Sequence, residues 1–172
     1  MLNFSVPSSI TKLRSKFLDK KSIDIFIKRD DLIHNIVAGN KWRKLKYNLQ
    51  EAQDLGYSTV LSFGGAYSNH LHALSYATNQ LSINSVGIVR GEQHVNLNTT
   101  LSFCKSQNML LHYLNRQDYK INKYVKTQLK LFKELFGDFY MIPEGGNNLL
   151  GVKGAEEILH EVNLDFDYIC CA

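Results

Sequence analysis

The sequence contains no apolar run that approaches the roughly 20 residues needed to span a bilayer. Its first seven residues, Met-Leu-Asn-Phe-Ser-Val-Pro, lack a basic segment followed by an apolar core, so no secretory signal is predicted. We therefore expect a cytoplasmic protein that does not act in a membrane.

Cysteine is scarce, with 3 residues at positions 104, 170 and 171. An odd number without framework spacing argues against a disulfide scaffold. Cys170 and Cys171 are neighbours in an apolar stretch, which predicts buried thiols on opposite faces of a strand. No second Cys or His pair has ligand spacing and no HExxH motif occurs, so no metal site is predicted.

The rest of the composition is ordinary for a globular protein. The chain has 172 residues, of which 44% are hydrophobic and 21% charged, enough for one domain or two small lobes. The formal net charge is +4. This mild excess suits an anionic ligand but does not by itself indicate a nucleic-acid partner, and none is predicted.

Apolar segments alternate with helical patterns along the chain. Strands are predicted at residues 22–27, 59–63, 85–89, 110–113, 139–142 and 167–171, and helices at 40–55, 69–80, 98–107, 120–136 and 150–161. Short apolar strands separated by helices are typical of βα units in a parallel sheet. The expected fold class is therefore α/β.

Lys41 is the first candidate for chemistry. It lies in the first turn of the predicted helix 40–55, with Asn40 as the expected N-cap and Gly56 as the stop. The positive end of the helix dipole disfavours a charged lysine and should lower its pKa, as a Schiff-base lysine requires. The alternative is that the basic residues of this helix form a solvated face. Nucleic-acid binding by that face is favoured even less, because Trp42, the aromatic residue beside the basic run, fits the buried stripe of the helix.

The second candidate is the segment 63–70, Phe-Gly-Gly-Ala-Tyr-Ser-Asn-His. It follows a strand and opens a helix that Ser68 or Asn69 caps, and the free N–H groups of such a terminus form an anion site. Ser68 could relay a proton and Asn69 could donate to a cofactor oxygen. The alternative is an ordinary βα turn.

The third candidate is the glycine-rich stretch 143–151. It lacks the spacing of a Walker loop or a dinucleotide fingerprint. We expect it to join two lobes rather than to line a pocket.

Taken together, these segments resemble the 1-aminocyclopropane-1-carboxylate deaminase/D-cysteine desulfhydrase family in order and spacing. The motifs lie at residues 27–32, 39–47, 64–70, 142–146 and 166–168. The resemblance covers the chain from about residue 22 onward. It implies a pyridoxal 5'-phosphate (PLP) enzyme of fold type II, with a three-layer parallel sheet, represented by its N-terminal half.

The resemblance also implies roles for particular residues. Lys41 would hold the cofactor as a Schiff base, and Ser68 would act beside the reacting carbon as base or nucleophile. Asn69 would bond the phenolic oxygen of the cofactor, and the backbone from Ser68 to His70 would hold the substrate carboxylate. His70 stands where ring-opening deaminases more often carry glutamine, which favours the desulfhydrase-like members. The substrate would be a small amino acid.

The expected domains are the first part of a large PLP domain (1–49), a small α/β domain (50–145) and the start of the remaining large domain (146–172). The phosphate-binding loop of the family follows the strand that here ends at Ala172, so we expect a truncated chain with impaired activity, and a homodimer if it is completed. The alternative is a non-catalytic fragment or interaction module, whose exposed apolar surface would bind dyes or aggregate.

Overall fold

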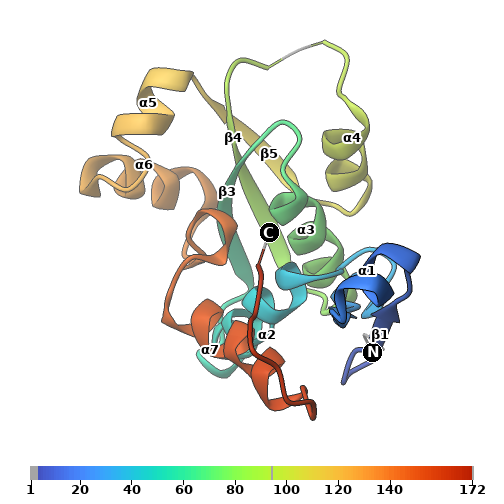
Figure 1. Cartoon of the computed structure of the whole chain (residues 1–172). Helices are drawn as coiled ribbons and strands as arrows, with labels where there is room; N and C mark the ends of the chain where they lie inside the picture. The colour runs from blue at the N-terminus through green and yellow to red at the C-terminus, as the bar shows by residue number, and fades with distance from the viewer. Residues whose placement is uncertain (1–3, 94, 172) are drawn as a thin grey trace.

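The centre of the molecule is a parallel sheet (Figure 1). The computed structural model describes residues 4–93 and 95–171, and four strands lie side by side in the order β5–β4–β3–β6. All neighbouring pairs are parallel. The strands are β3 (Thr59–Gly65), β4 (Asn84–Arg90), β5 (Leu110–Leu114) and β6 (Tyr140–Met141). The predicted α/β class with a parallel sheet is confirmed.

Helices cover both faces of this sheet. Successive residues of a strand point to opposite faces, so the strands present side chains to a layer of helices on each side. Val60 packs in one core with Leu71, and Phe63 packs in a second core with Phe132. The helices of the first side are α2 (Asn40–Asp54), α3 (Asn69–Gln80) and α4 (Thr99–Ser106). Helices α5 and α6 lie on the other side (Figure 1), and α7 (Leu149–His160) packs along α2. The three-layer expectation is also confirmed.

The predicted helix 120–136 is wrong as a single element. It forms two helices, α5 (Arg116–Ile121) and α6 (Lys126–Phe136). The chain turns between them, where the Val125 N–H donates to the Asn122 carbonyl at 2.9 Å. The turn lets Tyr119 from α5 and Phe132 from α6 enter the same core, which one straight helix would not allow.

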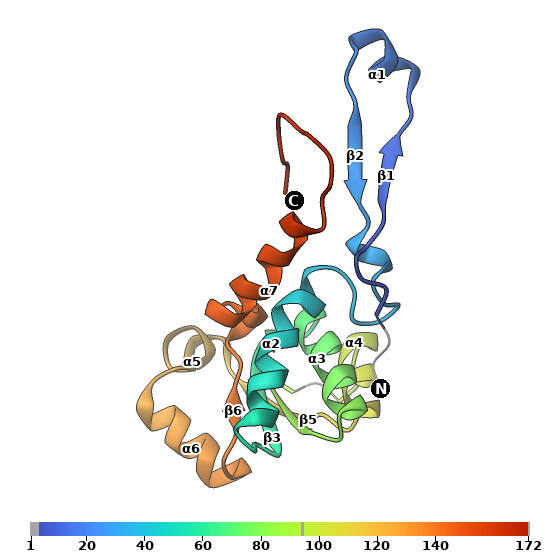
Figure 2. The ribbon, with the colours of Figure 1, turned by 90° about the horizontal axis from the view of Figure 1, so that it is seen from below.

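The N-terminal segment forms an extension that was not predicted. Strand β1 (Ile10–Leu13) pairs with β2 (Ile25–Lys28) in antiparallel register, and α1 (Lys16–Lys21) connects them. Ser22 caps α1 in a left-handed conformation with φ 53°, so the strand expected at 22–27 begins later. Figure 2 shows this extension projecting away from the body of the molecule.

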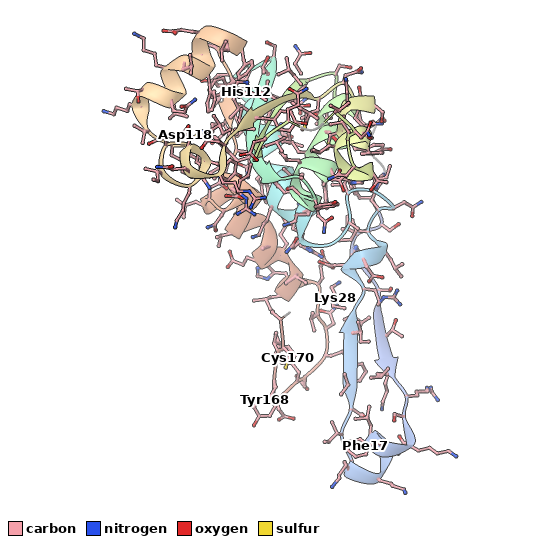
Figure 3. The ribbon with its side chains drawn as sticks, turned by 90° about the horizontal axis from the view of Figure 1, so that it is seen from above. Phe17, Lys28, His112, Asp118, Tyr168 and Cys170 are labelled. Carbon is pink, nitrogen blue, oxygen red and sulfur yellow. The ribbon has the colours of Figure 1, made fainter. Side chains whose placement is uncertain are left out.

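The strand predicted at 167–171 is also wrong. The described residues after α7 contain no strand, and Tyr168 is 89% exposed. Figure 3 shows Tyr168 and Cys170 on this segment beyond α7. A strand needs a neighbour to pair its backbone, and no strand of the described ranges lies against it. Cys170 and Cys171 are exposed, so the prediction that their thiols are buried is wrong, whereas Cys104 is buried.

Within residues 4–93 and 95–171, no helix has the length and apolar character needed to cross a membrane. The same residues contain no cluster of three or more His, Cys, Asp or Glu side chains that could hold a metal ion. The predicted division of the chain into domains at residues 49 and 145 stays a prediction. All four strands of the parallel sheet lie between those positions.

Candidate active site

Lys41 is the second residue of α2 and is half-buried. The predicted N-cap at Asn40 is wrong: Gly39 is the cap, with φ 61°, and Asn40 is already helical. The Gly39 N–H donates to the Asp30 carbonyl at 2.8 Å, so the chain enters the helix through a conformation that glycine tolerates best. Burial, followed by the charge of Lys44, lowers the pKa of Lys41. The lowered pKa favours the neutral amine.

A buried network of charges fixes the first turns of α2. The Arg43 guanidinium donates to both carboxylate oxygens of Asp30, at 2.6 and 2.9 Å, and to both oxygens of Glu161, at 3.0 and 2.9 Å. Lys28 donates to Glu161 at 2.6 Å, and the Ser8 hydroxyl donates to Asp30 at 2.6 Å. The network therefore ties three segments of the chain, around residues 8, 28–30 and 161, to the turn that carries Lys41.

Sequence reasoning missed this network. The alternative of a solvated basic helix face would leave Arg43 exposed, whereas the Arg43 side chain is 3% exposed. The available signal was the charged segment Lys-Arg-Asp-Asp at 28–31, which could supply partners for an arginine on the following helix. Burial alone would raise the pKa of Glu161, but hydrogen bonds from Arg43 and Lys28 lower it to about 2.

Ser68 caps α3, as the sequence predicts. Its Oγ accepts a hydrogen bond from the Leu71 N–H at 3.2 Å. A Cβ atom added at Gly64 would lie 2.4 Å from this oxygen, so the turn requires glycine there. Asn69 is the first helical residue and its side chain is exposed.

The start of α3 presents unused backbone donors. The Ser68 N–H is bonded to the Gly65 carbonyl at 3.0 Å. The N–H groups of Asn69 and His70 have no acceptor among the residues that the structure describes. Free N–H groups at the positive end of a helix favour a bound anion.

His70 lies under this turn and is 3% exposed. Its Nε2 atom is 2.8 Å from the Ser62 Oγ, and the Ser62 hydroxyl donates its proton to the Ile142 carbonyl at 2.8 Å. Nε2 must therefore be the protonated nitrogen, and Nδ1 is a buried acceptor without a partner in the described chain. Burial, followed by the charge of Lys41, lowers the pKa of His70 to about 3.

The glycine-rich stretch packs against these residues and does more than join lobes. The 3-10 helix η2 (Glu144–Gly146) lies over α2 and α3. A Cβ atom added at Gly146 would lie 3.0 Å from the Lys44 Cβ and 3.7 Å from the His70 Cε1. The prediction that this stretch only joins two lobes is therefore incomplete, because η2 also covers one side of the site.

The structure therefore brings α2, α3 and η2 together around His70, with Lys41 close enough for its charge to act on that ring. Two hollows of the described chain lie elsewhere. One, of about 460 Å³, lies between α2 and the end of α7, and one of about 350 Å³ lies beside α5. Neither is lined by Lys41, Ser68, Asn69 or His70.

Curated proteins of similar sequence match nearly the whole chain. A putative 1-aminocyclopropane-1-carboxylate deaminase of Thermotoga maritima is 32% identical over 99% of this chain and 56% of that protein. The bifunctional D-cysteine desulfhydrase/1-aminocyclopropane-1-carboxylate deaminase, mitochondrial, of Arabidopsis thaliana is 32% identical over 84% of this chain and 38% of its own length. The chain thus spans about half the length of the curated relatives that it matches. No protein-family model matches it.

Solved structures give the same result. A crystal structure of an ACC deaminase homologue superposes with a TM-score of 0.78 at 25% identity, over 97% of this chain and 51% of that one. A PLP-dependent aspartate racemase shares the fold, with a TM-score of 0.64 at 12% identity over 90% of this chain and 44% of that one. PLP is the cofactor that these relationships imply. Over nearly its whole length, this chain is a homologue of the 1-aminocyclopropane-1-carboxylate deaminase/D-cysteine desulfhydrase family, with the fold of type II PLP enzymes.

Proposed function

We propose that this chain contributes the lysine-bearing half of the active site of a PLP-dependent deaminase or desulfhydrase. The substrate is a small amino acid, of the D-cysteine or 1-aminocyclopropane-1-carboxylate type. The observation that carries the proposal is the half-buried amine of Lys41, with a lowered pKa, beside the neutral and buried ring of His70. An amine that is readily neutral suits covalent bonding to an aldehyde.

The residues present fit the cofactor. Lys41 would supply the amine for its aldehyde, and the exposed side-chain amide of Asn69 would donate to its phenolic oxygen. The unpaired N–H groups at the start of α3 suit the carboxylate of an amino acid. When bound, PLP supplies an electron sink for the substrate carbon.

Ser68 is the proposed proton carrier at the substrate. Its hydroxyl oxygen is held at the helix start by the Leu71 N–H, and its own proton remains available for transfer. The products are a keto acid and ammonia, with sulfide as a further product when the substrate is D-cysteine.

We expect the 172 residues by themselves to bind the cofactor weakly, because they span only about half the length of the curated relatives. The second candidate is therefore a non-catalytic fragment or interaction module. Exposed apolar side chains on the extension favour it, since Phe17 is 65% exposed at its tip (Figure 3). A cytoplasmic location and a homodimer stay predictions.

The test is a titration of the purified chain with PLP, followed by its visible absorbance band and by release of keto acid from D-cysteine. We expect a weak band that Lys41→Ala removes and that Lys44→Ala leaves in place. A full band in Lys41→Ala would reject the assignment of Lys41. A stable band with rapid turnover in the unmodified chain would reject the proposal that this chain is impaired. Strong binding of an apolar dye without any PLP band would favour the second candidate.

A further inference from the structure

A basic hollow of about 350 Å³ borders η2 through Glu144 and is not lined by Lys41, Ser68, Asn69 or His70. Arg90 enters it from the carboxyl end of β4, and Arg116 and Lys120 enter it from α5, the helix that follows β5. Lys123, Tyr119 and Glu144 complete its lining. Ligands of open α/β sheets bind beyond the carboxyl ends of the strands, which is where this hollow lies.

Positive charge in the hollow exceeds what its own carboxylate can neutralise. Glu144 is committed to Lys123, at 2.6 Å. Arg90, Arg116 and Lys120 form no salt bridge with any of residues 4–93 and 95–171. Three cations therefore face a concave surface without an anionic partner, an arrangement that attracts anions.

Tyr119 supplies an independent observation. The residue is 2% exposed, and its ring packs on Phe63, with ring centroids 6.4 Å apart. Its hydroxyl is enclosed and makes no hydrogen bond of normal geometry within the described chain. Burial, followed by a weak hydrogen-bonding contact with the Glu144 carboxylate, raises the pKa of the phenol, so the group stays a proton donor. A buried donor whose contact with its acceptor is this weak is costly, and an oxygen ligand in the hollow would satisfy it better.

The larger hollow beside α7 shows the contrast. It is also lined by cations, Arg43 and Lys46. Both are already paired, Arg43 with Asp30 and Glu161, and Lys46 with Glu157 at 2.7 Å. The cations of that hollow are therefore neutralised by carboxylates, whereas, among the described residues, three cations of the hollow beside α5 are not.

We propose that the hollow beside α5 binds a small oxyanion, a phosphate or carboxylate group, held by Arg116, Lys120 and Arg90. The Tyr119 hydroxyl donates to the same group. Guanidinium and ammonium groups bind such oxyanions through charge-assisted hydrogen bonds. This site goes beyond the proposed function and does not depend on it.

The test is calorimetric titration of the chain, without PLP, with pyrophosphate and separately with succinate, at about 150 mM KCl to screen diffuse attraction. The double variant Arg116→Gln, Lys120→Gln should bind the preferred anion at least about tenfold more weakly. The matched control, Lys126→Gln, Lys130→Gln, removes the same charge from exposed positions on α6 and should change binding less than about twofold. Absence of binding, or equal weakening by both doubles, would overturn the site.

Tighter binding of pyrophosphate than of succinate assigns the site to a phosphate group, and the reverse order assigns it to a carboxylate. Tyr119→Phe gives the second readout. Because the hydroxyl makes only a weak contact with Glu144 in the free chain, we expect a nearly unchanged melting temperature together with about fivefold weaker anion binding. A lower melting temperature with unchanged binding would show that the hydroxyl is structural and would overturn its role as a donor.

Discussion

Arg43 and Glu161 are separated by 118 residues in sequence and meet in two parallel hydrogen bonds, Nη1 to Oε1 at 3.0 Å and Nη2 to Oε2 at 2.9 Å. This contact fixes the end of α7 against the first turns of α2. Lys41 lies two residues before Arg43, so its position depends on a partner from the far end of the chain.

We predict that Arg43→Met is strongly destabilising. The change leaves Asp30 and Glu161 without the guanidinium that satisfies both carboxylates. Removing one partner of a buried ion pair typically costs about 3–5 kcal/mol, and the partial exposure of Glu161 places the expected loss at the lower end, about 3 kcal/mol. Urea unfolding measures the change in the free energy of unfolding.

Arg29→Met is the matched control for that prediction. Arg29 pairs with Asp31 at 2.7 Å, and both side chains are open to water. Exposed pairs contribute little, so its midpoint of unfolding should stay close to that of the unmodified chain. Equal loss in the two variants would show that the buried network has no special role.

Gly154→Ala should push α7 away from α2. A Cβ atom at Gly154 would lie 1.8 Å from the Arg43 carbonyl oxygen, which is backbone and cannot rotate away. We expect a loss of about 1–3 kcal/mol in the free energy of unfolding, measured by urea titration. Gly65→Ala is the control, because its added Cβ would meet nothing within 4 Å. Unchanged stability in Gly154→Ala would contradict the close packing of these helices.

Acid should destabilise the chain through His70. The ring is neutral in the folded protein down to a pKa of about 3, whereas the unfolded chain titrates near the ordinary value of 6.5. Between these values the unfolded state binds more protons, so the free energy of unfolding falls as pH falls, by up to about 1.4 kcal/mol per pH unit. Urea unfolding at a series of pH values from 7.5 to 5 would measure this slope.

The control for the acid prediction is His70→Gln, which carries no titrating group. Burial also lowers the pKa of His72 and of His112, and both remain in the variant. The difference between the two slopes therefore belongs to His70. Identical slopes in the two proteins would mean that His70 is not held neutral.

Lys44→Met should raise the pKa of Lys41, because it removes a nearby positive charge that acts on the amine. Burial of Lys41 would remain, so the pKa should stay below its ordinary value. The pH dependence of the acylation rate at Lys41, followed by peptide mass spectrometry, measures the change. Lys46→Met is the comparison, since Lys46 is paired with Glu157. A pKa of Lys41 that is insensitive to Lys44 would contradict the electrostatic description.

Local patterns explain which parts of the fold were predictable. Strand β3 and helix α3 follow from an apolar run, two glycines and the cap at Ser68, all adjacent in sequence. The break between α5 and α6 was missed because the helical pattern continues across Asn122, while the turn is set by burial of Tyr119 and Phe132. Packing against the sheet decided that element, and packing is not visible in a local pattern.

The features of the candidate site also divide into those that local sequence patterns show and those that depend on distant segments. Lys41 and Ser68 could be placed at helix starts because such starts have local sequence signals. The Arg43 network and the contact of Gly146 with Lys44 were missed because they join segments about 100 residues apart. Spacing along the chain cannot show which distant carboxylate meets a given arginine.

The most direct test of the central claim is to map where PLP becomes covalently attached. The chain is incubated with PLP, reduced with borohydride and digested, and the modified lysine is located by mass spectrometry. We predict that the peptide containing Lys41 carries the label at low PLP concentration, and that Lys41→Ala removes it while Lys44→Ala does not. Labelling spread over the exposed lysines, or retained at full level in Lys41→Ala, would contradict the assignment of Lys41.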